Sequence, residues 1–163
     1  ITIALESLQA AETNFLVSLT SAAEVVRAVD HPNFKLNADI FHMSRGGETP
    51  QSIVDAADVL AYCEMAEKES RSFPGVKGDD FKPWLRAWRM AKYKGYIFIE
   101  GNTNNPRNDM PLSFEYLTRQ LEEVYAEKKW KAGSYYIFSM KSKSDPLTWF
   151  FNNSSLFQDC TGC

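Results

Sequence analysis

The sequence has few histidines and cysteines, two and three among 163 residues, and it has no long apolar run. No stretch approaches the roughly 20 apolar residues that a membrane-spanning helix needs, so we expect no membrane segment. No charged leader precedes an apolar segment, as it does in a secretory signal peptide. The chain begins within the apolar run from Ile1 to Leu5 and without an initiating Met, which indicates a fragment or a processed chain.

The three cysteines do not form a metal-binding pattern. Cys63 lies in an apolar run, which is typical of a thiol in the core, whereas Cys160 and Cys163 have CxxC spacing at the end of the chain. A zinc site of this type needs a second pair of ligands, and no histidine follows these cysteines. We therefore expect no zinc site, and we expect a reduced, cytoplasmic environment.

The charge balance is slightly acidic, with a net charge of -3 and an isoelectric point near 5.4. Nucleic acids and anionic membranes bind concentrated basic surfaces, so neither is an expected partner. The content of 44% hydrophobic and 24% charged residues is typical of a soluble globular domain. Small neutral or weakly charged molecules stay open as ligands.

Strand-like and helix-like segments alternate in the first 132 residues. Apolar runs that favour strands cover residues 1–6, 34–39, 59–64 and 96–100. Helical spacing of apolar residues follows, for example from Asn14 to Val29 and from about Leu112 to Lys128. The repeated order predicts an α/β fold built of parallel (β/α) units. From Gly133 to Cys163 this order does not continue, so we expect an irregular C-terminal tail of unassigned structure after a domain of residues 1–132.

Each predicted strand ends in an acidic residue, namely Glu6, Asp39, Glu64 and Glu100. In parallel α/β folds the carboxyl ends of the strands form the ligand site, so these acids would meet there. Carboxylates gathered in one place repel one another unless a cation such as Mg²⁺ or Mn²⁺ holds them together. Two of them could act as general base and acid. The alternative is that each acid ends its strand and faces water.

The stretch from Asn37 to Met43 adds a second group to this place. It reads as a strand that runs into the loop from Ser44 to Glu48, with Asp39 and His42 at the strand end. The loop relaxes the alternation of the strand, so both side chains can face one opening. A carboxylate and an imidazole at this spacing indicate a metal or acid-base site.

Five spaced motifs carry a resemblance to a known family. They are Leu5-Glu6-Ser7 with Glu12, and the runs from Asp30 to Met43, Ala66 to Gly75, Asp79 to Phe81 and Tyr93 to Gly101. Together they resemble the sugar phosphate isomerase/epimerase family, the xylose isomerase-like TIM barrel group that includes ketose 3-epimerases and hydroxypyruvate isomerase. The resemblance covers about residues 1 to 130 and matches only the second half of such a barrel, strands five to eight.

The resemblance implies a divalent metal, Mn²⁺ or Mg²⁺, and a sugar or sugar phosphate as substrate. The implied metal ligands are Glu6, Asp39, Glu64 and Glu100. Of these, Glu6 and Glu100 would also move the proton, and the implied substrate-binding residues are Glu12, His42 and Arg71. The chain departs from the family at strand seven, where Tyr62-Cys63-Glu64 replaces a His-x-His pattern and a shift by one residue would place Met65 at the metal. The metal site is therefore either altered or lost.

A chain that matches only half of a barrel also needs further strands to complete it. Four parallel strands cannot close an eight-stranded barrel. Either the first half belongs to the parent protein, or two copies associate as a homodimer. Our first hypothesis is a metal-assisted sugar isomerase/epimerase. The alternatives are a truncated, catalytically inactive barrel fragment with a structural or interaction role, and a metal-dependent endonuclease for abasic DNA. The acidic balance and the few histidines count against the endonuclease.

Overall fold

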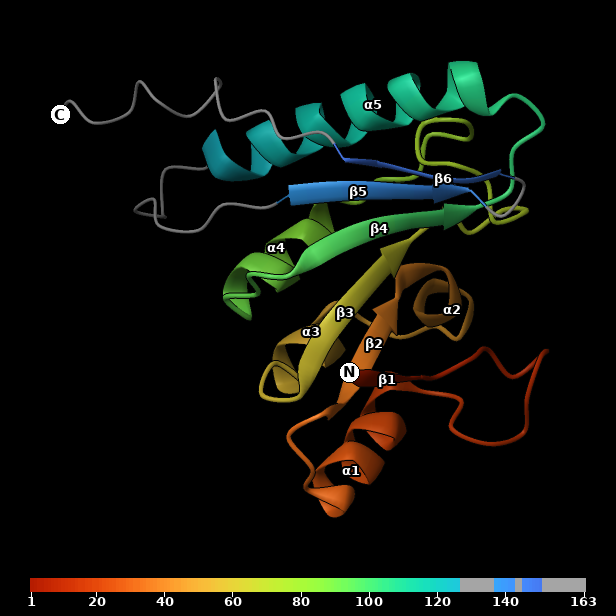
Figure 1. Cartoon of the computed structure of the whole chain (residues 1–163). Coiled ribbons are helices and arrows are strands. Elements are labelled where there is room, and N and C mark those ends of the chain that lie inside the picture. Colours follow the sequence, from red (N-terminus) through yellow and green to blue (C-terminus); the bar gives the residue numbers. More distant parts are fainter. Residues whose placement is uncertain (127–136, 143–144, 151–163) are drawn as a thin grey trace, which may run out of the picture.

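The computed structural model describes residues 1–126, 137–142 and 145–150. Six strands form one sheet in the order β1-β2-β3-β4-β5-β6 (Figure 1). The strands are β1 (Ile3–Glu6), β2 (Phe34–Asp39), β3 (Leu60–Met65), β4 (Tyr96–Gly101), β5 (Ile137–Ser142) and β6 (Asp145–Phe150). All pairs from β1 to β5 are parallel, and β6 runs antiparallel to β5. The predicted parallel sheet of four strands that alternate with helices is confirmed.

The connections between the parallel strands contain the helices. They are α1 (Leu19–Val29), α2 (Ile40–Arg45), α3 (Gln51–Asp55), α4 (Lys82–Met90) and α5 (Pro106–Ala126). Apolar side chains from all five helices join one core cluster with the strands. In the part of the chain that the structure describes, none of the helices has the length and apolar character that crossing a membrane requires.

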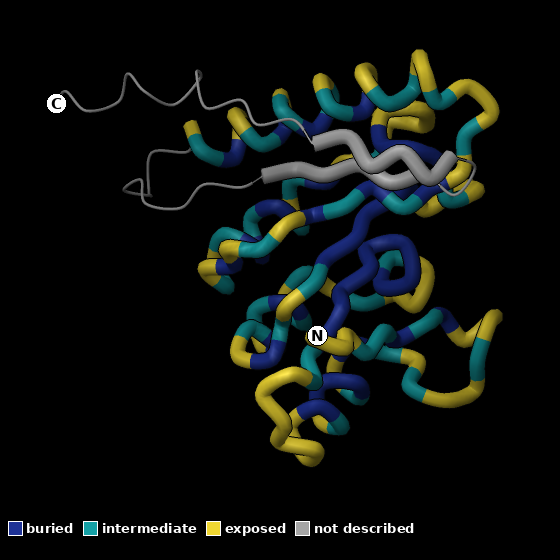
Figure 2. Tube along the Cα trace, in the orientation of Figure 1, coloured by how far each residue is buried: buried dark blue, intermediate teal, exposed yellow. Residues whose placement is uncertain are grey.

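The two faces of the sheet differ in polarity because side chains alternate along each strand. The residues that face the helices are buried and apolar, and they are Leu36, Ala38, Cys63, Met65, Ile97 and Ile99. Figure 2 shows the buried positions concentrated in the middle of the sheet, along β2 and β3. The other face carries the acidic residues of the strand ends. Cys63 is fully buried in the core cluster, as predicted.

The first helix begins five residues later than its apolar spacing predicted. Ser18 precedes α1, and its side chain accepts a hydrogen bond from the backbone N–H of Ser21 at 3.2 Å. The carboxylate of Glu48 accepts the N–H of Leu19, with both oxygens at 3.0 Å. These acceptors satisfy the free N–H groups of a helix start. Phe15, which fits the helical spacing, lies instead in the preceding loop and is 70% exposed.

The last helix begins earlier than predicted. Proline is favoured at the first position of a helix because its fixed φ angle suits the helix and it has no N–H to satisfy. Pro106 takes this position in α5, six residues before the predicted start at Leu112. The predicted end at Lys128 lies outside the described residues.

The expectation of an irregular tail after residue 132 is wrong for two segments. β5 pairs in parallel with β4 over the register from Tyr96 with Ile137 to Gly101 with Ser142, and β6 pairs with β5. An open edge of β4 offers unpaired backbone groups, and a further strand satisfies them without any helical spacing in the sequence. The predicted boundary between residues 132 and 133 stays a prediction, and Cys160 and Cys163 lie outside the described residues.

Candidate metal and acid-base site

The acidic ends of β1 to β4 meet at one place. Glu6 and Asp39 are the last residues of their strands, and Glu64 and Glu100 are the last but one. Because the strands are parallel, their carboxyl ends lie at the same edge of the sheet. Each of the four side chains offers one oxygen, and these oxygens lie within 4.8 Å of one another. The predicted convergence is confirmed, while the roles of the four residues stay predictions.

Crowding and burial change the protonation of these carboxyl groups. Burial, followed by repulsion from the other three acids, raises the pKa of Glu6 to about 8. Burial is also the main cause that raises the pKa of Glu64 to about 7, although a hydrogen bond from Asn37 acts in the opposite direction. Burial raises the pKa of Asp39, and the positive charge of Arg71 opposes this shift. Near neutral pH the cluster therefore retains protons unless a cation offsets the repulsion.

The sequence predicted His42 at a strand end, but the structure places it inside α2. The helix begins directly after β2 because Asp39 caps it. The Oδ1 atom of Asp39 accepts a hydrogen bond from the backbone N–H of Phe41 at 2.8 Å. The loop, which the sequence predicted from Ser44 to Glu48, therefore starts two residues later, after Arg45. The helix nevertheless returns His42 to the acids, because residues three apart lie on one face of a helix.

The imidazole of His42 faces the carboxylates through its Nε2 atom. Nε2 lies 3.5 Å from Glu6 Oε1 and 3.6 Å from Asp39 Oδ2. Nδ1 accepts a hydrogen bond from the backbone N–H of Gln9 at 3.3 Å. Burial lowers the pKa of His42, which favours the neutral ring. The guanidinium of Arg71, which can only donate, lies 3.2 Å from Nε2, so donors face both ring nitrogens, and a neutral imidazole can accept at only one of them.

Arg71 comes from the loop between β3 and α4 and enters the cluster. Its Nη2 atom lies 2.6 Å from Asp39 Oδ2 and 2.5 Å from Glu100 Oε2. Its Nε atom donates to the backbone oxygen of Glu100 at 3.1 Å, and its Nη1 atom lies 3.2 Å from His42 Nε2. The guanidinium also stacks on Phe41 at 4.7 Å. The structure thus places this predicted substrate-binding residue against the predicted metal ligands themselves.

Glu12, the third predicted substrate-binding residue, lies at the margin of the site on the loop between β1 and α1. Its Oε1 atom is 3.7 Å from His42 Nδ1 and accepts a hydrogen bond from Gln9 Nε2 at 2.5 Å. Its side chain is 44% exposed, so it can reach a ligand that enters from solvent. All seven predicted site residues are therefore connected in one network of contacts.

Asn37 is a site residue that the sequence analysis missed. Its Nδ2 atom donates to Glu64 Oε2 at 2.7 Å, and its Oδ1 atom is buried without a hydrogen-bond partner among the described residues. Asn37 lies two residues before Asp39 on β2, so both side chains project from the same face of the sheet. That spacing was the signal in the sequence. The bond holds the carboxylate of Glu64 toward the cluster.

Glu67 is a second residue that the sequence analysis missed, because a charged residue in a polar loop normally faces water. It is fully buried, and its carboxylate accepts hydrogen bonds from the backbone of the loop between β3 and α4. The donors are the N–H groups of Gly75 at 2.8 Å, Lys77 at 2.5 Å, Gly78 at 2.8 Å and Asp79 at 3.3 Å. Glu67 thus organises the loop that carries Arg71.

The donor atoms fit a hard divalent cation. Four carboxylates supply oxygen ligands only, which suits Mg²⁺ and Mn²⁺. Glu64 reaches the cluster, and Met65 is fully buried in the core cluster on the other face of β3. The shift that would place Met65 at the metal is therefore excluded. A second group of possible ligands, Glu6, Asp39 and His42, shares two of these acids and adds a nitrogen.

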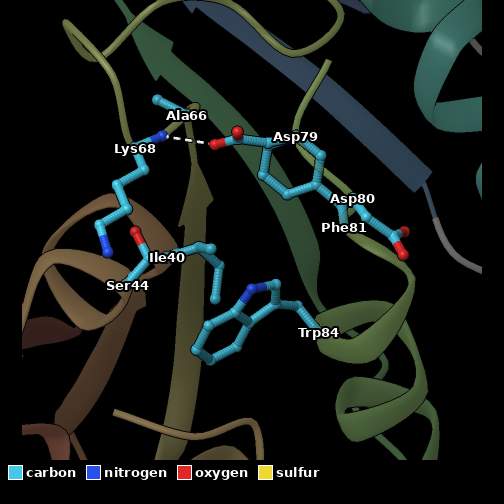
Figure 3. Close-up of a pocket in the computed structure, with 8 residues that line it drawn as sticks. All are labelled: Ile40, Ser44, Ala66, Lys68, Asp79, Asp80, Phe81 and Trp84. Carbon is cyan, nitrogen blue, oxygen red and sulfur yellow. Dashed lines mark hydrogen bonds between the residues drawn. The ribbon is translucent and has the colours of Figure 1, made fainter. Parts of the chain in front are cut away.

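Two cavities lie outside the cluster. The one in Figure 3 has a volume of about 220 Å³, and Ile40, Ser44, Lys68, Asp79 and Trp84 contribute to its lining. None of the four clustered acids lines it. The second cavity, of about 310 Å³, is lined mainly by hydroxyl and amide side chains from the loops after β3 and β4. None of the seven predicted site residues lines either cavity.

The sequence is similar to proteins of one family. The profile of the family described as xylose isomerase-like TIM barrel matches residues 1–120. A Danio rerio protein provisionally named hydroxypyruvate isomerase is 31% identical over 88 residues, which cover 53% of this chain and 32% of that protein.

Solved structures show the same fold. L-ribulose 3-epimerase gives a TM-score of 0.67 at 18% identity, over 81% of this chain and 52% of the other. The 3-keto-D-glucoside 4-epimerase from E. coli gives 0.62 at 21% identity, over 73% and 45%. A D-allulose 3-epimerase from Methylomonas sp., solved in complex with D-allulose, gives 0.59 at 24% identity, over 77% and 48%. The chain spans about a third of the curated relative and about half of these structures.

Proposed function

Because the chain belongs to the xylose isomerase-like TIM barrel family, we propose that its carboxylate cluster is a metal-assisted site for sugar isomerisation or epimerisation. The substrate is a ketose or a related hydroxy-carbonyl compound, and the reaction moves a proton on the carbon next to the carbonyl group. The observation that carries the proposal is the approach of four carboxylates within 4.8 Å. The names of the similar epimerases and of the similar isomerase agree with this class of reaction.

Glu6 and Glu100 are the proposed proton carriers. Without a cation the pKa of Glu6 is raised to about 8, so its surroundings favour uptake of a proton, which suits a carboxylate that accepts and returns one. Glu100 lies on β4, three strands away in the sheet order, and accepts a hydrogen bond from Arg71. Its carboxylate takes the proton from the substrate carbon. Two carriers on separate strands can serve two faces of one carbon, and inversion of a carbon requires a proton to leave one face and return to the other.

The proposed ligands of the cation are Glu6, Asp39, Glu64 and Glu100. When bound, a divalent cation stabilises the negative oxygen that develops as the proton leaves carbon. Asn37 holds the Glu64 carboxylate in place. Since both raised pKa values reflect burial and mutual repulsion, these carboxyl groups release their protons when a cation binds.

The remaining polar groups position the substrate. Arg71 and His42 lie side by side, with Nη1 of the guanidinium 3.2 Å from Nε2 of the ring, and the N–H groups of Arg71 can be donated to a hydroxyl or carbonyl oxygen of a sugar. Glu12 offers a carboxylate at the margin of the site. Tyr62 and Phe98, each two residues before an acid on β3 or β4, stack at 4.4 Å and form an apolar surface beside the cluster. Such a surface limits the access of water to the reacting carbon.

We further propose that β1 to β4 correspond to strands five to eight of the barrel. The order of strands and their acidic ends supports this assignment. β1 is an edge strand of the sheet, and Ile3 on it is 63% exposed. An edge of this kind favours pairing with a further strand. The proposed partner at this edge is a further parallel strand, from the same polypeptide or from a second copy of the chain, whereas β5 occupies the edge of β4 in this structure.

The test is exchange of substrate hydrogen with solvent. A panel of ketoses is incubated in D₂O with the protein and Mn²⁺, and proton NMR follows the carbon next to the carbonyl group. We expect deuterium to enter at that carbon with the unaltered chain, and we expect Glu100→Gln, which removes the proposed base, to abolish the exchange. Glu24→Gln, which changes an exposed acid on α1, is the matched control and should retain it. Exchange that persists in Glu100→Gln would remove Glu100 from the mechanism, and no exchange with any ketose would favour a non-catalytic role.

A further inference from the structure

Arg71 is built into the carboxylate cluster more firmly than a substrate-binding residue requires. One guanidinium nitrogen, Nη2, bridges Asp39 and Glu100, two of the four proposed metal ligands. The side chain is only 11% exposed, and its other contacts are with the backbone of Glu100, the ring of Phe41 and the imidazole of His42. The arginine therefore satisfies acids that the proposed function assigns to a cation.

The backbone of the loop fixes this position. Ser70 and Arg71 both have positive φ angles, 59° and 51°, in the left-handed region that costs free energy for residues with a Cβ atom. Hydrogen bonds to Asn102 hold both residues at the end of β4. The N–H of Asn102 donates to the oxygen of Arg71 at 2.7 Å, and its Nδ2 atom donates to the oxygen of Ser70 at 3.0 Å. The strained segment is therefore fixed by specific contacts.

The charges explain why a cationic side chain lies there. The cluster contains four carboxylates. One of them, Glu64, stands where the family that the sequence resembles has a histidine. Arg71 supplies one positive charge in direct contact with two of these acids. A divalent cation bound to the same acids would need the oxygen lone pairs that now accept from the guanidinium, and it would lie within a few ångströms of a like charge.

We propose that Arg71 is the internal counter-cation of the cluster and that it competes with a divalent cation for Asp39 and Glu100. Binding of the cation then releases the guanidinium toward His42, where its N–H groups are available for a substrate oxygen. This inference rests on the proposed metal-assisted function. It adds that the side chain of Arg71 couples binding of the cation to binding of the substrate.

Mn²⁺ titration calorimetry on charge variants tests the competition. Arg71→Gln removes the competing charge, and Arg71→Lys keeps a charge without the planar guanidinium whose Nη2 atom bridges two acids. The matched control is Arg45→Gln. Arg45 lies over the same ring, 5.8 Å from the centre of Phe41, but its hydrogen bonds go to Gln9 and to the backbone of Lys68. It thus carries the same charge close by, and its hydrogen bonds go to groups other than the four acids.

We expect Arg71→Gln to bind Mn²⁺ about tenfold more tightly than the unaltered chain, a factor typical of coupled sites. Arg71→Lys should gain less, and Arg45→Gln should stay within about twofold, since its interaction with the site is screened. If the unaltered chain binds Mn²⁺ and Arg71→Gln binds no more tightly, the competition is refuted while the proposed function stands. If neither binds, both fail. Binding by Arg71→Gln alone would support the competition and contradict metal-assisted catalysis by the unaltered chain.

Thermal unfolding without added metal gives a second measurement that does not depend on activity. Arg71→Gln should unfold at a lower temperature than Arg45→Gln, because Asp39 and Glu100 then lose the positive charge that contacts both of them. Saturating Mn²⁺ should remove this difference. If Arg71→Gln does not fold without metal but folds with Mn²⁺, the proposal is supported. A difference that Mn²⁺ leaves unchanged would overturn it, because Arg71 would then be only a packing residue.

Discussion

Lowering the pH should weaken metal binding far more than ordinary carboxylate ligands would allow. A cation binds ionised carboxylates, so protons on Glu6 and Glu64 compete with it. The pKa of Glu6 is raised to about 8 and that of Glu64 to about 7, in each case mainly by burial. Both groups are therefore protonated at pH 6 and lose their protons between pH 7 and 8, so the affinity rises with pH over this window.

The magnitude follows from the two pKa values. At pH 6 about one Glu6 in a hundred and about one Glu64 in ten are ionised, whereas at pH 8 the fractions are about one half and nine tenths. The fraction of molecules with both groups ionised thus grows by about 500-fold between pH 6 and pH 8. Carboxylates with ordinary pKa values near 4.5 would change the affinity by less than about twofold over the same range.

Isothermal titration with Mn²⁺ at pH 6, 7 and 8 measures this dependence. Titrations in two buffers of different ionisation enthalpy also count the protons released on binding. We expect a rise in affinity of more than about a hundredfold and the release of more than one proton at pH 6. An affinity that changes by less than about threefold, without proton release, would refute the assignment of Glu6 and Glu64 as shifted metal ligands.

The stability of the metal-free protein should change with pH in the opposite direction to the affinity for Mn²⁺. A carboxyl group with a raised pKa binds its proton more tightly in the folded than in the unfolded chain. The folded state therefore binds more protons between the unfolded pKa near 4.5 and the folded values near 7 and 8. Stability should fall as the pH rises through this window, and added Mn²⁺ should reverse the fall. Urea unfolding at several pH values measures it, and a stability that increases from pH 6 to pH 8 without metal would contradict the shifts.

Three substitutions, with a fourth as a control, extend these tests. Glu67→Gln replaces a carboxylate that accepts four backbone N–H bonds with an amide that also carries donors. It should lower the free energy of unfolding, measured by urea titration, by about 2–4 kcal/mol. A loss below about 0.5 kcal/mol would contradict the role of Glu67 in holding the loop. Glu64→His should raise the affinity for Co²⁺ relative to Mg²⁺ by about tenfold or more, because imidazole suits the later transition metals, and an unchanged ratio would exclude Glu64 as a ligand. Gly75→Ala should destabilise the protein by about 1–3 kcal/mol, because φ is +93° and a Cβ atom would meet the ring of Tyr116 at 3.0 Å. Gly47→Ala, at φ +74° with no atom within 4 Å of a Cβ, should cost less, and equal losses would contradict the steric part of this reasoning.

The acidic strand ends were predictable because two simple rules fix them. Apolar runs locate the strands, and parallel strands bring their carboxyl ends to one edge of the sheet. Glu6, Asp39, Glu64 and Glu100 therefore meet as expected. The position of Glu64 also follows from alternation, since Cys63 and Met65 on either side of it belong to the core.

The supporting contacts were not predictable from spacing, because they depend on tertiary contacts between distant segments. Asp39 caps α2 with its own side chain, which ends β2 and turns an expected loop into helix. Glu48 satisfies the start of α1 from 29 residues away, so the helix begins after Phe15. Glu67 looks like a solvated loop charge until the loop folds over it. β5 carries no helical spacing at all, and its pairing with β4 is set by an open edge.

The most direct test of the central claim is Mn²⁺ binding by the purified chain at pH 8, compared with Glu100→Gln and with the surface control Glu24→Gln. If the four strand-end carboxylates form one metal site, the unaltered chain and the control bind about one Mn²⁺ saturably, and Glu100→Gln loses most of the affinity. Circular dichroism checks that all three proteins are folded. Absence of binding in the folded, unaltered chain, or binding that Glu100→Gln leaves unchanged, would contradict the account.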